Sequence, residues 1–202
     1  MARHSAIRYF PAMKFLLAFP ILFALAAPAA AANPPAQQAS SEAQKEIDKL
    51  FGNLAKAGSE EAAKPIEDQI VTLFGQSGSA SIDLLMNHAA AALQAGDAAT
   101  AKEIVITITE IAPGFAQGWV ERAAIAQAEK DDAGALTYLQ KAVTLNPRQF
   151  EALAELGGIL VSYGDKKQAL QYFRKAQALD PFLAGIGKQV DQLARDVEGE
   201  KI

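Results

Sequence analysis

The chain has 202 residues, of which 50% are hydrophobic and only 7% aromatic, and it contains no cysteine. An alanine-rich composition of this kind favours closely packed helices, and the lack of cysteine excludes disulfide bonds and thiolate metal sites. A formal net charge of −4 argues against nucleic-acid binding, which requires a basic surface.

Residues 1–32 have the three-part pattern of a secretory signal peptide. Arg3, Arg8 and Lys14 precede an apolar run over 15–27, and small residues follow over 28–32. We expect cleavage after Ala30 or Ala32 and export to a bacterial periplasm. A membrane anchor is the alternative, but the run is short and interrupted by proline. The mature chain would hold 16 Lys and Arg against 23 Asp and Glu, a net charge of −7, and no second membrane span.

Residues 33–40 read as a flexible lead-in, because they contain two prolines and small polar residues. An N-terminal helical hairpin is then expected over 41–81. Ser41 and Gln44 have capping-box spacing and predict a helix over 41–56. The second helix begins either at Ser59, with acidic residues in its first turn, or at Pro65, and runs to about Phe74.

A 34-residue interval then governs the chain. Prolines, aspartates, alanines and large aliphatic residues each recur three times at this spacing, namely Pro113, Pro147 and Pro181; Asp97, Asp131 and Asp165; Ala101, Ala135 and Ala169; Ile111, Leu145 and Leu179. Such a period marks a stacked helical repeat. The units are 82–115, 116–149 and 150–183. Each consists of a helix, a tight turn and a second helix; the repeated aspartate caps the start of the second helix, and the repeated proline ends it.

The pattern of small and large residues within these units resembles the tetratricopeptide repeat family. The third unit matches best, with Leu156, Gly157, Gly164, Ala169 and Phe173 of the expected types. The second departs at Arg122 and Lys130, and the first at His88 and Val105. A narrower likeness is to exported bacterial members of unassigned activity, carried by the runs Ser77-Gly78-Ser79, Ala112-Pro113-Gly114-Phe115 and Asn146-Pro147-Arg148-Gln149.

This resemblance implies an all-α fold. We expect a right-handed superhelical α-solenoid of three helix-turn-helix repeats over 82–183, preceded by the N-terminal hairpin. An amphipathic helix over 184–202 would cap the last repeat, because an array needs a terminal helix with one polar side.

No catalytic, cofactor or metal site is predicted. His88 is the one histidine of the mature chain, and alone it does not make a zinc site. Ser77 lacks the surroundings of a nucleophilic serine and reads as part of a turn, with Ser79 or Ser81 capping the next helix. The repeated aspartates lie one per turn, and no phosphate-binding glycine motif occurs. An enzyme is therefore the least favoured class.

The resemblance places a concave binding groove on the first helix of each repeat, at eighteen positions that include no Lys or Arg. The candidate binding residues are Asp83, Met86, Asn87, Gln117, Val120, Glu121, Gln127, Glu151, Glu155 and Val161; the other eight are Ala90, Leu93, Gln94, Ala124, Ala128, Ala154, Gly158 and Ser162. Without basic residues the groove does not suit acidic peptide tails. We expect it to prefer a neutral or basic protein segment, unless the N-terminal helices cover it.

The predicted function is thus an exported scaffold that binds another protein, in cell-envelope assembly. The alternative is an envelope-polymer or glycan-binding protein, which exposed aromatic residues in the groove would favour; the listed positions hold none.

Overall fold

The computed structural model describes residues 35–199, which form helices joined by short turns. The predicted signal peptide lies outside these residues. None of the helices that the structure describes is long and apolar enough to cross a membrane. In chain order they are α1 (Pro35–Leu54), α2 (Glu60–Phe74), α3 (Ala80–Gln94), α4 (Ala98–Ile111), α5 (Ala116–Ala128), α6 (Asp132–Leu145), α7 (Phe150–Ser162), α8 (Lys166–Leu179) and α9 (Ile186–Glu198).

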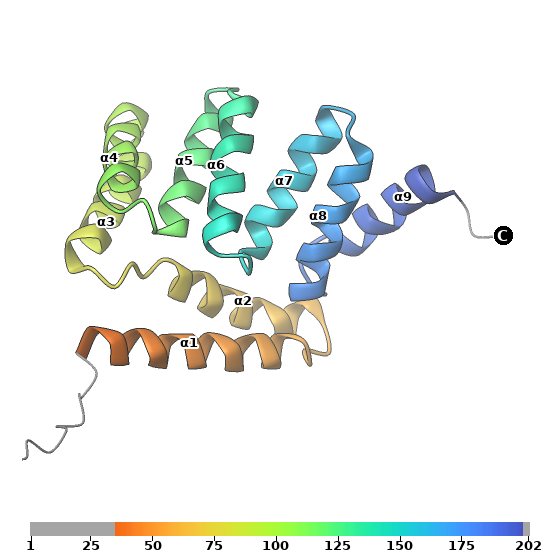
Figure 1. Cartoon of the computed structure of the whole chain (residues 1–202), viewed down its shortest axis with the longest axis horizontal. Coiled ribbons are helices and arrows are strands. Elements are labelled where there is room, and N and C mark those ends of the chain that lie inside the picture. Colours follow the sequence, from red (N-terminus) through yellow and green to blue (C-terminus); the bar gives the residue numbers. More distant parts are fainter. Residues whose placement is uncertain (1–34, 200–202) are drawn as a thin grey trace, which may run out of the picture. The chain divides into compact units, whose positions relative to one another are not determined.

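The three predicted repeats are confirmed as the helix pairs α3–α4, α5–α6 and α7–α8, which follow one another in a solenoid (Figure 1). The predicted caps are also present. The carboxylates of Asp97, Asp131 and Asp165 accept the backbone N–H of the residue three positions later, at 2.9–3.0 Å. Each cap satisfies a donor that the helix start would otherwise leave without a partner.

In the N-terminal hairpin, α1 begins earlier than predicted, and α2 has the first of its two predicted starts. Helix α1 begins at Pro35, so part of the expected flexible lead-in is helical and Ser41 lies inside the helix. Proline suits the first helical position, and Ala36 to Ala39 continue a helix readily. Helix α2 begins at Glu60, after the cap formed by Ser59, whose hydroxyl accepts the N–H of Ala62.

The start of α2 at Pro65 is therefore wrong. Pro65 lies inside the helix. The hydroxyl cap and the two acidic residues of the first turn stabilise the turn that precedes it, which offsets the hydrogen bond that the proline removes.

Small residues let the two helices of each repeat approach closely. Ala101, Ala135 and Ala169 are fully buried, as are Ala123 and Ala142. Gly157 is the tightest case, because an added Cβ would lie 2.6 Å from the ring of Phe173 on the paired helix. The phenylalanine thus fills the space that the missing side chain leaves, which explains the small-large pairing seen in the sequence.

The hairpin packs on the third repeat. Phe150, at the start of α7, lies edge-on to Phe51 of α1, with ring centroids 6.2 Å apart. Both belong to a buried cluster with Leu54 and Ile70, against which Phe182 packs. Arg148 adds an ion pair to Asp48 and lies over the Phe51 ring. Figure 1 shows α1 and α2 running across the ends of the repeat helices, from the third repeat towards the first.

Helix α9 covers the other side of the third repeat, as predicted for a capping helix, although it begins at Ile186 rather than 184. Ile186, Val190 and Leu193 are buried against α8. Two ion pairs fasten its outer side, Lys166 to Asp196 and Arg174 to Glu198.

Gly157 and its neighbour Gly158 offer a matched test of this packing. Gly157→Ala should lower the free energy of unfolding by about 1–3 kcal/mol, because the new methyl group clashes with Phe173. Gly158→Ala meets nothing within 4 Å and should raise it by about 0.5–1 kcal/mol, since alanine favours the helix. Urea unfolding followed by circular dichroism measures both; equal effects of the two changes would refute close packing at Gly157.

The turns inside the repeats give a second test. Gly96 and Gly164 adopt left-handed φ values of 79° and 81°, and Lys130 takes the same place in the second repeat with φ 63°. A side chain in this region costs roughly 1–2 kcal/mol. Lys130→Gly should therefore stabilise the protein by about 1 kcal/mol in thermal or urea unfolding, whereas Lys130→Ala, which removes the charge and keeps the Cβ, should give no such gain.

Candidate functional site

The predicted groove residues lie on α3, α5 and α7, and many of them are exposed. Asn87, Ala90, Ala124, Glu151 and Gly158 reach solvent. Leu93 and Val161 are 46% and 38% exposed, which is unusual for large aliphatic side chains in this protein. The hairpin therefore does not cover the groove at these positions.

Glutamines and glutamates form hydrogen bonds along the groove between neighbouring repeats. The Gln117 amide donates to Glu121 at 2.8 Å and accepts from Gln149 at 3.1 Å. The Gln127 amide donates to Glu155 at 3.1 Å, which links α5 to α7. These bonds hold the carboxylates of adjacent repeats in fixed positions, and each amide still offers polar atoms to a ligand.

Three carboxylates influence one another across α5 and α7. Burial is the largest effect on Glu155 and raises its pKa, and the negative charges of Glu151 and Glu121 raise it further, against the hydrogen bond from Gln127. Glu151 is exposed, but partial desolvation likewise raises its pKa, and Lys64 of the hairpin partly opposes this effect. A cation placed among the three would relieve this repulsion, because like charges at close range disfavour ionisation.

A pocket of about 650 Å³ opens where the first and second repeats meet. The groove supplies Leu93, Glu121, Ala124 and Ala128, and the rest of the lining comes from α4 and the end of α5. Sequence reasoning placed the groove on the first helices alone and so missed Ala98, Lys102 and Ile106. Their spacing of four residues puts them on one face of α4, away from the buried stripe of Ala101, Val105 and Ile108.

Asp83 and Ser77 are hydrogen-bonded to each other. Asp83 accepts the N–H and the hydroxyl of Ser77 at 2.9 and 2.6 Å, so its carboxylate fastens the turn before α3. Ser79 precedes α3 but makes no side-chain cap. Within residues 35–199 no hydrogen bond joins His88 to Ser77 or Asp83, and no three His, Asp or Glu side chains are arranged to hold a metal ion.

The remaining candidates lie on the same helices. Met86 of α3 and Val120 of α5 are half-buried, and Val120 packs against the cluster of Ala123 and Leu156. They contribute apolar surface between the carboxylates and do not converge on a single point.

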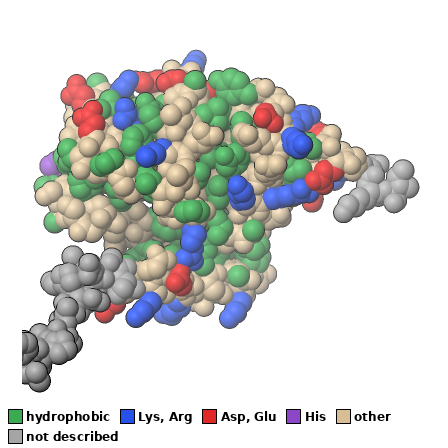
Figure 2. Space-filling model, viewed as in Figure 1, with side chains coloured by type: hydrophobic (Ala, Val, Ile, Leu, Met, Phe, Trp, Pro, Cys, Tyr) green, Lys and Arg blue, Asp and Glu red, His purple; other side chains and the backbone are tan. Residues whose placement is uncertain are grey.

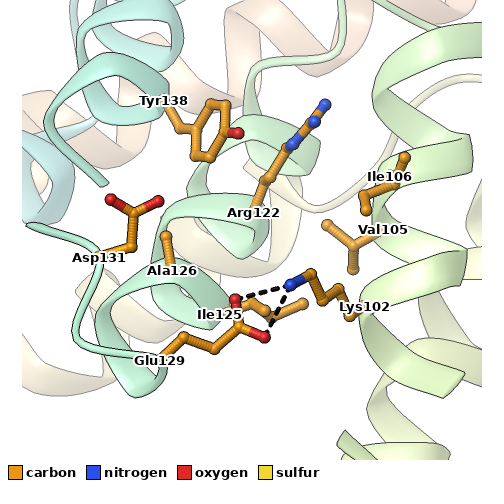
Figure 3. Close-up of a pocket in the computed structure, with 9 residues that line it drawn as sticks. All are labelled: Lys102, Val105, Ile106, Arg122, Ile125, Ala126, Glu129, Asp131 and Tyr138. Carbon is orange, nitrogen blue, oxygen red and sulfur yellow. Dashed lines mark hydrogen bonds and ion pairs between the residues drawn. The ribbon is translucent and has the colours of Figure 1, made fainter. Parts of the chain in front are cut away.

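Arg122 lies at the seam, the contact between the first and second repeats. Its contacts there explain why an arginine stands at a position where the family pattern has an aliphatic residue. Its guanidinium lies 4.6 Å from the centre of the Tyr138 ring and 5.6 Å from that of Trp119, and it donates to the hydroxyl of buried Thr109 at 2.7 Å. A small cavity of about 90 Å³ separates it from the Lys102–Glu129 ion pair, which joins α4 to α5 (Figure 3). Stacking on two rings thus lets a cation replace an aliphatic residue here.

Comparison with known proteins agrees with the repeat pattern. The family model described as Tetratricopeptide repeat matches residues 150–182. A TPR repeat-containing protein of Rhizobium etli is 26% identical over 204 residues, covering 98% of this chain and 99% of its own length.

Two solved structures show the same fold. The first TPR of Spaghetti (RPAP3), bound to the HSP90 peptide SRMEEVD, has a TM-score of 0.52 at 15% identity, covering 58% of this chain and 93% of its own. The Yersinia enterocolitica type III secretion chaperone SycD, in complex with a peptide of the translocator YopD, has a TM-score of 0.52 at 14% identity, covering 60% and 97%.

Arg122→Lys should test the seam. Lysine keeps the charge but loses the planar stacking and the bond to Thr109, so we expect the free energy of unfolding to fall by about 1–2 kcal/mol. Arg195→Lys, at an exposed position of α9, should change it by less than about 0.5 kcal/mol. Urea unfolding of both variants measures the difference, and an unchanged Arg122→Lys would show that the stacking contributes no stability.

Proposed function

Because the chain belongs to the tetratricopeptide repeat family, we propose that it is an exported, non-enzymatic scaffold that binds a neutral or basic segment of another protein in the groove of α3, α5 and α7. The observation that carries this proposal is the set of carboxylates Glu121, Glu151 and Glu155 beside exposed aliphatic side chains. Glutamine hydrogen bonds hold two of them, Glu121 and Glu155.

The charge of the groove favours this class of ligand over acidic peptides. None of its eighteen residues is basic, and the nearby cations are already engaged: Lys102 with Glu129, and Lys64 with Asp68. The Spaghetti domain binds a peptide with three acidic residues, SRMEEVD. The groove of this chain is acidic, so it would repel such a tail and attract Lys or Arg side chains instead.

Apolar contact would supply the rest of the binding energy. Leu93 is at the mouth of the 650 Å³ pocket, and Val161 lies near a smaller one of about 180 Å³ against α9. Exposed aliphatic side chains beside fixed polar groups are typical of peptide-binding surfaces. No aromatic residue lines either pocket apart from Phe173, so stacking on a sugar ring has less support than contact with a peptide.

The cellular setting rests on residues 1–32. Their signal-peptide pattern supports export to the periplasm, and from there a role in cell-envelope assembly. Fusion of residues 1–32 to a reporter that is active only after export would test this step separately from the groove.

Binding of defined peptides tests the groove. We expect 12-residue peptides of net charge +3 to bind more tightly than hydropathy-matched peptides of charge −3. Glu121→Gln combined with Glu155→Gln should weaken binding of the +3 peptides about five- to thirtyfold, since each of the two partly desolvated charge pairs contributes on the order of 0.5–1 kcal/mol. Isothermal titration calorimetry on the folded variants measures both.

The matched control is Glu42→Gln combined with Glu110→Gln, which removes two exposed carboxylates outside the groove. Its affinity should equal that of the unchanged protein. A pull-down from periplasmic extract with Glu121, Glu155 and Val161 all replaced should lose the partner. Recovery of the same partner by that triple variant, or equal affinity for the two peptide charges, would refute the groove as the binding site.

A further inference from the structure

Two carboxyl groups lie buried where the hairpin meets the third repeat. Glu67 of α2 is 6% exposed, and Asp180, which follows the last residue of α8, is fully buried. The two carboxyl groups are close enough for each to act on the ionisation of the other. If both were ionised, Glu67 Oε1 and Asp180 Oδ2 would have no donor, and an unpaired charge in such a place is costly.

The surroundings favour a proton on Glu67 rather than on Asp180. Asp180 Oδ1 accepts the backbone N–H of Phe182 at 3.0 Å, which stabilises its ionised form. Glu67 has only Lys64, whose Nζ is 3.7 Å from Oε2 and which also pairs with Asp68 at 2.9 Å. The nearby negative charges of Asp68 and Asp180 oppose ionisation of Glu67, and burial is the largest effect; together they raise its pKa to about 7.

The ion pair of Asp48 with Arg148, which also joins the hairpin to the repeats, does not share this pH sensitivity. Asp48 of α1 accepts from Arg148, and this bond holds the pKa of Asp48 below its usual range. It therefore stays ionised throughout the neutral range. Glu151 of α7 lies close enough to Asp180 for their charges to interact, and it too is negative when ionised. Among the residues that the structure describes, Lys64 is the cation that acts on Glu67.

We propose that the Glu67–Asp180 carboxyl pair is a proton-controlled latch that holds the α1–α2 hairpin on the third repeat. With one proton shared, Glu67 donates to Asp180 and the interface is complete. When the proton leaves, two carboxylates face each other in a buried contact, and the hairpin separates from α8 and exposes Phe51 and Phe150. This inference does not depend on the proposed ligand of the groove.

The direction of the pH dependence follows from the raised pKa. A carboxyl that binds its proton more tightly in the docked state favours docking fully below its ordinary pKa of 4.5, and that contribution is lost as the pH rises towards 7. The equilibrium for opening should increase by up to about tenfold per pH unit over this interval and level off above it.

Hydrogen exchange on the whole protein tests the latch. Between pH 5.5 and 7.5, and after correction for the intrinsic rate, we expect protection of residues 60–74 relative to residues 132–145 to fall roughly tenfold or more. In Glu67→Gln, whose amide donates to Asp180 at every pH, the relative protection should not change with pH. The matched control Glu110→Gln, an exposed carboxyl on α4, should behave as the unchanged protein.

A second measurement needs no variant of the pair. Carbon-13 NMR titration of the glutamate carboxyl groups in the unchanged protein should show one midpoint near 7. Circular dichroism establishes that Glu67→Gln is folded; if it is not, Asp180→Asn serves instead and should lower that midpoint. A pH-independent protection ratio, or titration of every glutamate below pH 5.5, would overturn the latch.

Discussion

Close approach of paired helices at buried small residues is the constraint on which the structure depends. Ala101, Ala135 and Ala169 have no exposed surface. At Gly157 the ring of Phe173 occupies the space that a side chain would need. Larger side chains there would separate the helices of a repeat and misplace every later unit, because each repeat is positioned by the one before it. The orientation of α3, α5 and α7, and hence the groove, follows from these contacts.

The groove gains its chemical character from residues that the packing leaves free. Glutamine amides hold Glu121 and Glu155 in place, so the carboxylates are ordered before any ligand arrives and little side-chain entropy remains to be lost on binding. Figure 2 shows Lys and Arg side chains along the lower edge, over the hairpin. Other Lys and Arg side chains are scattered over the repeats in the same view, but none of the eighteen groove residues is basic. The carboxylates of the groove are thus available to attract a partner of the opposite sign.

A structural feature can be predicted from the sequence when the residues that cause it lie close together along the chain. The three repeats follow from a fixed interval and from caps such as Asp131, whose partner is three residues away, so their pattern is legible along the chain. The start of α1 at Pro35 was missed, and the sequence left the start of α2 open between Ser59 and Pro65. In both places the local rule about proline is outweighed, by neighbouring helix formers in α1 and by a serine cap in α2. The role of Asp83 was missed because its nearest donor, Ser77, was read only as a turn. Glu67 and Asp180 give no signal at all, since each is an ordinary charged residue until folding brings them together across more than a hundred positions.

The ion pair of Arg148 with Asp48 joins residues 100 positions apart. Such a contact affects how cooperatively the repeats unfold. A linear array of repeats unfolds from its ends, because each unit contacts only its neighbours. Here the α1–α2 hairpin also contacts the third repeat, so that repeat is tied to a segment that is not its neighbour in the sequence. This contact also means that removing or adding a repeat would alter the span that the hairpin must cross, and this chain cannot change length one unit at a time as open solenoids do.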